Sequence, residues 1–434
     1  MKTFYLLLIY LALVSVSRAE SSNAGPEAQP ARISLGEVTS IVLANNPAIQ
    51  QALRKWDAAK ARITQEGAWD DLRVSGSSRV ARFVDVAPNA FADQMVSVEQ
   101  IIPLTGKNLV RARVAAADAV AAFEQARREQ LDVLAKTRTS YFRLLNANAQ
   151  LELNRKNLTS LRQIAEVSRS RYEVGKANAA EPLAGEVEAS KLLESERDIL
   201  RNISAEQSQL NVLMNRDAFA ALGQPEETKI KSTVPSMEQT RALALANRPE
   251  IKIAEAKIDM EKSRLDLARR NWIPDPAVTV QAQRYNDSRQ AASELDAGVS
   301  FTVPWINPGK YSAAVREAKE NLAAAEHWLD QTNAESLGLL RDALQKVHTA
   351  KHHVELFRER LVPQVRQAFE ANQFAYETGK ASFLEWITAQ RNLRDLEAMG
   401  QQHVADYYAA LAELEAIVGA DLNIFPSTKA KEPK

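Results

Sequence analysis

Three side chains in the C-terminal part of the sequence stand at a spacing that could hold a metal ion. His348 and His352 are four residues apart, and Glu355 follows three residues later. On a helix these side chains share one face, and zinc accepts imidazole and carboxylate ligands. The spacing differs from the His-Glu-x-x-His pattern of zinc proteases, and histidines on an exposed face of a charged helix are usually solvated. The three residues are therefore candidate metal ligands, against the alternative that they form a solvated surface.

Two other patterns could suggest enzymatic chemistry. Thr105-Gly106-Lys107 has the ending of a phosphate-binding loop, but no glycine stands five residues earlier and Pro103 interrupts the segment. Pairs of nearby carboxylates such as Glu186 and Glu188 occur, but helix surfaces commonly carry such pairs and nothing drives their acidities apart. We therefore predict no catalytic residues, no nucleotide site, no cofactor and no enzymatic activity.

Composition narrows the class of protein further. The chain has 434 residues, with 55 Lys plus Arg balanced by 55 Asp plus Glu, so no excess charge indicates a nucleic-acid partner. It has no cysteine, which excludes thiol catalysis, disulfides and lipid attachment through an N-terminal cysteine. Only 14 glycines are present, which favours long helices over glycine-rich folds.

The N-terminus has the pattern of an export signal. Lys2 provides a positive start, residues 4–16 are apolar, and Ser17-Arg18-Ala19 is a small-x-small cleavage site. We predict a signal peptide over residues 1–19, followed by a linker over residues 20–33. An N-terminal membrane anchor is the alternative, although the apolar run is shorter than the ~20 residues that span a bilayer. No later stretch is long and apolar enough, so any further membrane crossing requires strands.

The sequence contains two copies of one unit. Three segments of the first half recur in the same order about 200 residues later, which indicates duplication. The matched segments are residues 34–47 with 236–249, Ile102-Pro103-Leu104-Thr105-Gly106-Lys107 with the run from Val303 to Lys310, and residues 172–177 with 376–381. We predict repeat 1 over residues 34–223, a linker over 224–235, repeat 2 over 236–420 and a tail over 421–434.

Each repeat is predicted to contain a moderate helix, two strands, a very long helix and another moderate helix. Ser34 with Glu37, and Ser236 with Gln239, form capping signals for the first helices. Residues 107–172 lack proline and carry a coiled-coil-like apolar stripe, so that helix would be a rod of about 100 Å. Its counterpart contains Pro363, which should kink it.

The strands alternate between apolar and polar residues. We predict strands at about 72–84, 95–102, 277–285 and 295–303. Apolar-out and polar-in is the pattern of a transmembrane barrel with an aqueous lumen, but a soluble sheet on a core has the same alternation. The polar side chains of interest could tune ion preference in a lumen or simply be solvated; they are Arg73, Arg79, Glu99, Gln281 and Asp296. Four strands cannot close a barrel, whereas three copies would provide about twelve strands and room for a passage.

The helix openings, the strand-Pro-x-x-Gly-Lys junctions and the paired Tyr-Glu-x-Gly-Lys-Ala turns resemble the TolC-like outer-membrane efflux family, over about Ser34 to Gly419. The stretches 268–276 and 376–391 look most like its CzcC-like heavy-metal branch. The resemblance implies a mainly α fold with a small β part, in which a homotrimer forms a 12-stranded barrel joined to a long α-helical barrel. It also implies a periplasmic adaptor and an inner-membrane pump as partners. Many relatives carry a lipidated cysteine after the signal peptide, so this chain should be held in outer-membrane lipid by its barrel alone.

The same resemblance assigns the two repeated turns to the periplasmic tips, where they would contact the adaptor and border the gate. The residues concerned are Tyr172, Gly175, Lys176, Ala177, Tyr376, Gly379, Lys380 and Ala381. A glycine after a long helix allows the left-handed residue that ends it, so these turns could instead be simple helix caps. The predicted function is a passive efflux duct for metal cations or drugs in the outer membrane, extending into the periplasm. A periplasmic or secreted long-helix scaffold without channel activity is the alternative.

Overall fold

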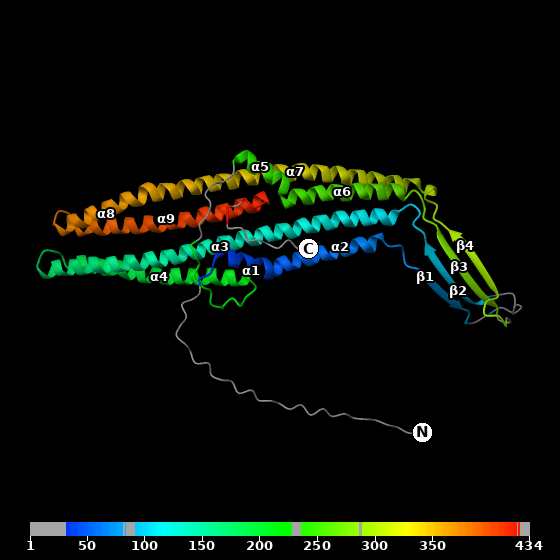
Figure 1. Cartoon of the computed structure of the whole chain (residues 1–434), viewed down its shortest axis with the longest axis horizontal. Coiled ribbons are helices and arrows are strands. Elements are labelled where there is room, and N and C mark those ends of the chain that lie inside the picture. Colours follow the sequence, from blue (N-terminus) through cyan, green and yellow to red (C-terminus); the bar gives the residue numbers. More distant parts are fainter. Residues whose placement is uncertain are drawn as a thin grey trace, which may run out of the picture.

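A computed structural model describes residues 32–80, 83, 92–227, 236–285, 289–422 and 424–425. The chain is a long rod with a four-stranded sheet at one end and two helical hairpin tips at the other (Figure 1). The predicted signal peptide, most of both linkers and most of the C-terminal tail lie outside the described residues. No helix in the described part of the chain combines the length and apolarity needed to cross a lipid bilayer.

Both repeats place their elements in the same order. Repeat 1 contains α1 (Leu35–Asn45), α2 (Pro47–Gly67), β1 (Arg73–Ser78), β2 (Ala92–Ile101), α3 (Lys107–Glu173) and α4 (Ala180–Leu213). Repeat 2 contains α5 (Met237–Asn247), α6 (Pro249–Arg270), β3 (Ala277–Tyr285), β4 (Glu294–Ser300), a short 3-10 turn (Pro304–Ile306), α7 (Pro308–Leu356), a π-helical segment η3 (Phe357–Leu361), α8 (Val362–Glu377) and α9 (Phe383–Val418).

The single first helix predicted for each repeat is wrong, because two helices stand there. The break falls at Asn46-Pro47 in repeat 1 and at Arg248-Pro249 in repeat 2, where the residue before proline is extended. The Asn46 side chain accepts hydrogen bonds from the backbone of α2 and donates one to the Leu213 carbonyl at 2.9 Å. Proline suits the first position of a helix, so each break is also a helix start.

The long helices run almost the full length of the rod, as Figure 1 shows for α3 and for α7 with α8. α3 is 67 residues long and uninterrupted. In repeat 2 the turn just before Pro363 is π-helical over Phe357–Leu361. This wider turn makes room for the proline ring and leaves no carbonyl waiting for the N–H that proline lacks. The helix therefore continues past Pro363 with a local change of winding.

The strands form one sheet in the order β1-β2-β3-β4, with every neighbouring pair antiparallel. Two strands end earlier than predicted. β1 ends at Ser78, before the expected residue 84, and residues 81, 82 and 84 are not described. β4 ends at Ser300, before the expected residue 303, because Pro304 opens a helical turn.

The main core lies at the middle of the rod, where α1, α3, α7 and α9 meet the segment after α9. That segment follows Gly419, which ends α9 with a left-handed φ of 74°. A Cβ on Gly419 would lie 2.8 Å from the Asn247 carbonyl oxygen.

Gly419→Ala is therefore expected to lower the midpoint of thermal unfolding in detergent. The left-handed conformation alone costs an alanine about 1–2 kcal/mol, and the clash adds to it. Gly338, inside α7, is the matched control, because an added Cβ there meets nothing within 4 Å. Gly338→Ala should raise the midpoint, since glycine in a helix costs roughly 0.5–1 kcal/mol relative to alanine. Equal shifts in the two variants would contradict this account of Gly419.

Candidate functional site

One face of the sheet is polar and brings four of the five candidate lumen residues together. Cross-strand neighbours point to the same side, and the register places Arg73 opposite Glu99 and Gln281 opposite Asp296. An Arg73 guanidinium nitrogen lies 3.3 Å from a Glu99 carboxylate oxygen. Arg79 lies beyond the end of β1, so it does not belong to the ladder.

The opposite face is a band of exposed apolar side chains. Its members alternate with the polar residues along every strand and include Val74, Val96, Val280, Leu295 and Val299. Polar residues bound this band on both sides, with Gln100 toward the helices and Gln94 paired with Arg284 toward the far end. An apolar band between two polar rims on a sheet is the pattern of a surface that faces lipid.

The loop-like triplet 105–107 has a structural role at the junction of sheet and helices. The Asp275 carboxylate accepts hydrogen bonds from the Thr105 amide at 3.2 Å and the Thr105 hydroxyl at 2.7 Å, and it pairs with the Lys107 ammonium at 3.1 Å. Lys107 also donates to the Ile273 carbonyl at 2.7 Å. These contacts join repeat 1 to repeat 2 beneath the sheet. The sequence did not predict this role of Asp275.

The two repeated turns have the same backbone design. Gly175 and Gly379 adopt left-handed φ angles of 72° and 77°. The Lys176 amide donates to the Arg171 carbonyl at 2.8 Å, and the Lys380 amide donates to the Ala375 carbonyl at 2.7 Å. This is the hydrogen bond that closes a Schellman C-cap. Both lysines are exposed, and Ala177 and Ala381 are half-buried.

The two tyrosines of these turns differ sharply in their surroundings. Tyr172 is 49% exposed, whereas Tyr376 is 2% exposed and lies in a cluster between the two hairpins. The Tyr376 ring stacks on Trp386 with centroids 4.8 Å apart, and its hydroxyl donates to Glu181 at 2.8 Å. Burial and the neighbouring Glu181 carboxylate raise the pKa of Tyr376, so the hydroxyl keeps its proton and donates.

Arg171 on α3 connects the first hairpin to the end of α8. Its guanidinium donates to the Tyr376 carbonyl at 2.7 Å and to the Glu377 carbonyl at 3.2 Å, and it lies 4.6 Å from the Tyr376 ring centroid. A cation there complements the negative end of the helix dipole. No sequence motif predicted that Arg171 belongs to the tip.

A buried carboxylate further along the same hairpins ties α4 to α9. Glu188 is 2% exposed, and its oxygens lie 2.7 Å from Lys191, 2.8 Å from Arg391 and 3.7 Å from Arg394. Burial raises the pKa of Glu188, but the hydrogen bonds from Lys191 and Arg391 outweigh it and hold that pKa below its ordinary value. Glu188 is therefore charged, and its contacts with Arg391 and Arg394 hold α4 against α9.

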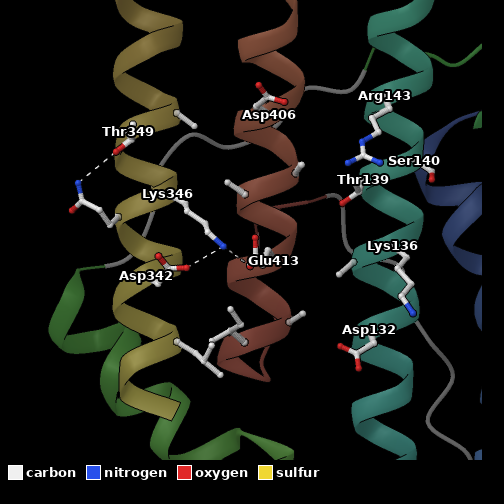
Figure 2. A pocket seen from close by; sticks show the side chains of 18 of the residues that line it. Asp132, Lys136, Thr139, Ser140, Arg143, Asp342, Lys346, Thr349, Asp406 and Glu413 are labelled. Atoms are coloured by element: carbon white, nitrogen blue, oxygen red, sulfur yellow. Dashed lines mark hydrogen bonds and ion pairs between the residues drawn. The ribbon is translucent and has the colours of Figure 1, made fainter. Parts of the chain in front are cut away.

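Figure 2 shows a groove between α3, α7 and α9 whose walls carry charges of both signs. Lys346 lies between Asp342 and Glu413, 3.0 Å from each carboxylate. Asp132 and Lys136 stand on the opposite wall, on α3.

The candidate metal ligands do not converge. His348, His352 and Glu355 are exposed on α7, and Glu355 pairs with Lys351 at 3.7 Å. The His353 ring lies between two others, with centroids 4.8 Å from that of His403 and 6.3 Å from that of His352. No group of three His, Cys, Asp or Glu side chains among the described residues is arranged to hold a metal ion.

The rod, the four-stranded sheet with one apolar and one polar face, and the duplicated helical hairpins together define an outer-membrane channel fold. A family model described as outer membrane efflux protein matches residues 38–214 and 241–420. The chain belongs to this family. Membership places it in the outer membrane with its helices extending into the periplasm, and the family consists of channels and not enzymes.

Individual relatives agree with the family. The cobalt-zinc-cadmium resistance protein CzcC of Cupriavidus metallidurans is 22% identical over 374 residues, covering 83% of this chain and 85% of the relative. TolC of Escherichia coli is 21% identical over 285 residues, covering 61% and 57%. The solved structure of CusC superposes with a TM-score of 0.79 at 16% identity, covering 92% of this chain and 95% of that one. VceC from Vibrio cholerae gives a TM-score of 0.75 at 16% identity, covering 89% and 96%.

Proposed function

We propose that this protein is the outer-membrane exit duct of a tripartite efflux system. Three copies would close the barrel, because one copy provides a sheet of four strands with two edges and lipid tolerates no open edge. A pump in the inner membrane and a periplasmic adaptor would supply energy and cargo at the hairpin tips. The observation that carries the proposal is the two-faced sheet at one end of a long helical rod.

Metal cations are the cargo we infer. The support is the 22% identity to CzcC, which is named for resistance to cobalt, zinc and cadmium and is covered along 85% of its length. The polar strand face would line the duct, with Arg73, Glu99, Gln281 and Asp296 facing the passing ions. Drugs are the second candidate, because a toluene efflux protein of Pseudomonas putida is 24% identical over 391 residues.

The test is to purify the protein from outer membranes in mild detergent, and to measure its mass by light scattering and its conductance in planar bilayers. A three-chain particle with a long hollow cylinder and ion conductance supports the proposal. A detergent-independent monomer or dimer without conductance rejects it and favours a periplasmic scaffold. Cargo is then tested by deleting the gene and comparing the zinc, cadmium and toluene tolerance of the cells.

Two neighbouring residues of β3 should respond oppositely to the same substitution. Val280 lies on the apolar face opposite Val98 and Ala297, whereas Gln281 lies on the polar face. Val280→Arg is expected to reduce assembled protein in the outer membrane, since arginine facing lipid near the bilayer centre costs about 2–4 kcal/mol. Gln281→Arg should assemble normally and shift the reversal potential toward anions. Normal assembly of Val280→Arg would show that this face does not meet lipid.

A further inference from the structure

A cluster of rings lies where α9 passes the π-helical segment η3. The His403 ring of α9 packs edge-on with Phe357, the first residue of η3, and the two ring centroids are 4.6 Å apart. On its other side lies the His353 ring of α7, and 21% of the His403 side chain is exposed. π-Helical turns inside long helices frequently occur at functional sites. His403 is therefore packed against the place where the long helix of repeat 2 changes its winding.

Hydrogen bonds lead from the surroundings of His403 to the other repeat. One carboxylate oxygen of Asp406 lies 3.9 Å from His403 Nδ1, which is too far for a hydrogen bond. The other oxygen of Asp406 accepts a hydrogen bond from Gln402 Nε2 at 2.8 Å. Gln402 Oε1 in turn accepts one from Asn146 Nδ2 on α3 at 2.9 Å. The side chains next to His403 thus hold α9 against α3.

The elements packed against His403 carry further charges, several of them in ion pairs. Arg143 of α3 lines the same groove as His403 and Asp406 (Figure 2). A protonated His403 would attract the Asp406 carboxylate, which is the acid beside its ring, and would meet His353 as its nearest titratable neighbour on α7. The paired groups on α7, η3 and α9 are Lys346 with Asp342 and Glu413, Lys351 with Glu355, and Arg358 with Glu359.

We propose that His403 is an acid-sensitive switch, which loosens α9 from α3 and from the π-helical segment when its imidazole takes up a proton. The cation draws the Asp406 carboxylate away from Gln402, so the hydrogen bonds that lead to Asn146 weaken. The charged ring also stands in a position that is largely closed to water, which disfavours its present packing. In the proposed duct the loosened α8–α9 hairpin would raise the conductance. This effect on conduction rests on the proposed function, whereas the loosening of α9 does not.

The surroundings of His403 also set the direction of its pH dependence. Burial and the neighbouring His353 lower the pKa of His403 below its ordinary value of 6.5, and Asp406 opposes that shift. The unfolded chain therefore binds this proton more tightly than the folded protein does. The stability of the folded protein should fall as the pH decreases through the window below 6.5.

Thermal unfolding in detergent at about pH 7.5 and about pH 5.5 tests the switch, because the charge of histidine changes in this range. His403→Gln retains a polar side chain that takes up no proton there. The matched control is His327→Gln, which removes an exposed imidazole of α7. The unfolding midpoint should fall on acidification in the natural protein and in His327→Gln, and fall less in His403→Gln. Carboxylates titrate alike in all three proteins, so an equal fall in all three overturns the proposal.

Hydrogen exchange locates the change within the rod. After correction for the pH dependence of intrinsic exchange, acid should accelerate exchange in α9 around His403 and in α3 around Asn146. His403→Gln should show neither acceleration. Gln402→Leu breaks the connection to Asn146 and retains the imidazole, so it should exchange fast around Asn146 at both pH values. Acceleration of equal size in the natural protein and in His403→Gln would mean that another group senses the acid.

Single-channel conductance connects the switch to the duct. Acid should raise the conductance of the natural protein and of His327→Gln, and should leave that of His403→Gln unchanged. Gln402→Leu should conduct at neutral pH as the natural protein does in acid. A protein that does not conduct rejects the duct, and its exchange at the two pH values still decides the switch. A conducting channel whose exchange and conductance do not respond to acid retains the duct and overturns the switch.

Discussion

Arg138→Ala is expected to lower the free energy of unfolding of the helical rod by about 3–5 kcal/mol, because it leaves a carboxylate buried without its cation. Arg138 lies on α3 and Glu415 on α9, and a guanidinium nitrogen is 2.5 Å from a carboxylate oxygen. The two side chains are only 9% and 6% exposed. The Arg138 guanidinium also lies 4.2 Å from the ring centroid of Phe425, so its loss loosens the segment after α9.

The measurement is thermal unfolding in detergent, followed by the helical signal in circular dichroism. Removing both charges, as in Arg138→Met with Glu415→Leu, should restore most of the stability, since an apolar pair of similar volume often replaces a buried ion pair without loss. Arg201→Ala is the surface control, because Arg201 and Asp198 are 75% and 74% exposed and 4.0 Å apart. If Arg138→Ala unfolds at the temperature of the natural protein, the pair contributes nothing.

The stability lost in Arg138→Ala should also depend on pH, and the burial of Glu415 determines the direction of that dependence. Burial raises the pKa of Glu415 above its ordinary value of 4.5, and Arg138 opposes that rise. Without Arg138 the folded protein would hold a proton on Glu415 more tightly than the unfolded chain does. Stability of Arg138→Ala should therefore fall as the pH rises through the window above 4.5 and recover on acidification. The difference from the natural protein should be smallest at the acid end.

The sequence predicted the features of this fold that depend on local signals. The capping boxes at Ser34 and Ser236 mark helix starts, and the glycines of the repeated turns mark helix ends. Strand alternation predicted which side chains share a face, because the side-chain period of a strand is two whatever the sheet packs against. The two-helix start of each repeat was missed although Pro47 and Pro249 indicate it, since proline at the first helical position both ends one helix and begins the next.

The contacts that join the repeats could not be predicted from one sequence. Asp275 meets Thr105 across 170 residues, and Arg138 meets Glu415 across 277. No periodic pattern in the sequence indicates that such distant positions are in contact. Many other carboxylates of the chain have similar neighbours in the sequence. The same holds for His348 and His352, because their spacing places them on one helix face but does not indicate which side chains of neighbouring helices lie near them.

At the tips, prediction from the repeat is limited in another way. Residues that the duplication makes equivalent have different environments there. Tyr172 and Tyr376 stand at the same position of the same motif, yet the hairpins of the two repeats pack asymmetrically at that end of the rod. Tyr376 faces the neighbouring hairpin and Tyr172 faces solvent. A sequence motif gives the turn, whereas the packing of its side chains depends on which repeat lies next to it.

Tyr376→Ala is therefore expected to destabilise the tip by about 3–5 kcal/mol, the usual cost of deleting a buried aromatic side chain, whereas Tyr172→Ala should change it by less than about 0.5 kcal/mol. The first substitution removes the ring stacked on Trp386, the hydroxyl bonded to Glu181 and the surface under Arg171. The readout is hydrogen exchange of the α8–α9 turn and of the end of α3. Exchange should accelerate at both places in Tyr376→Ala and at neither in Tyr172→Ala.

Tyr376→Phe separates packing from the hydroxyl. It retains the ring but removes the hydroxyl that donates to Glu181, which keeps its hydrogen bond from the Asn178 amide, so it should cost about 0.5–1.5 kcal/mol, the net value of one hydrogen bond. If the tips form the constriction of the duct, single-channel conductance should rise in the order natural protein, Tyr376→Phe, Tyr376→Ala, while Tyr172→Ala conducts like the natural protein. Faster exchange in Tyr376→Ala with unchanged conductance would place the constriction elsewhere along the rod. Equal effects of the two alanine substitutions would mean that the hairpins are not held together through Tyr376.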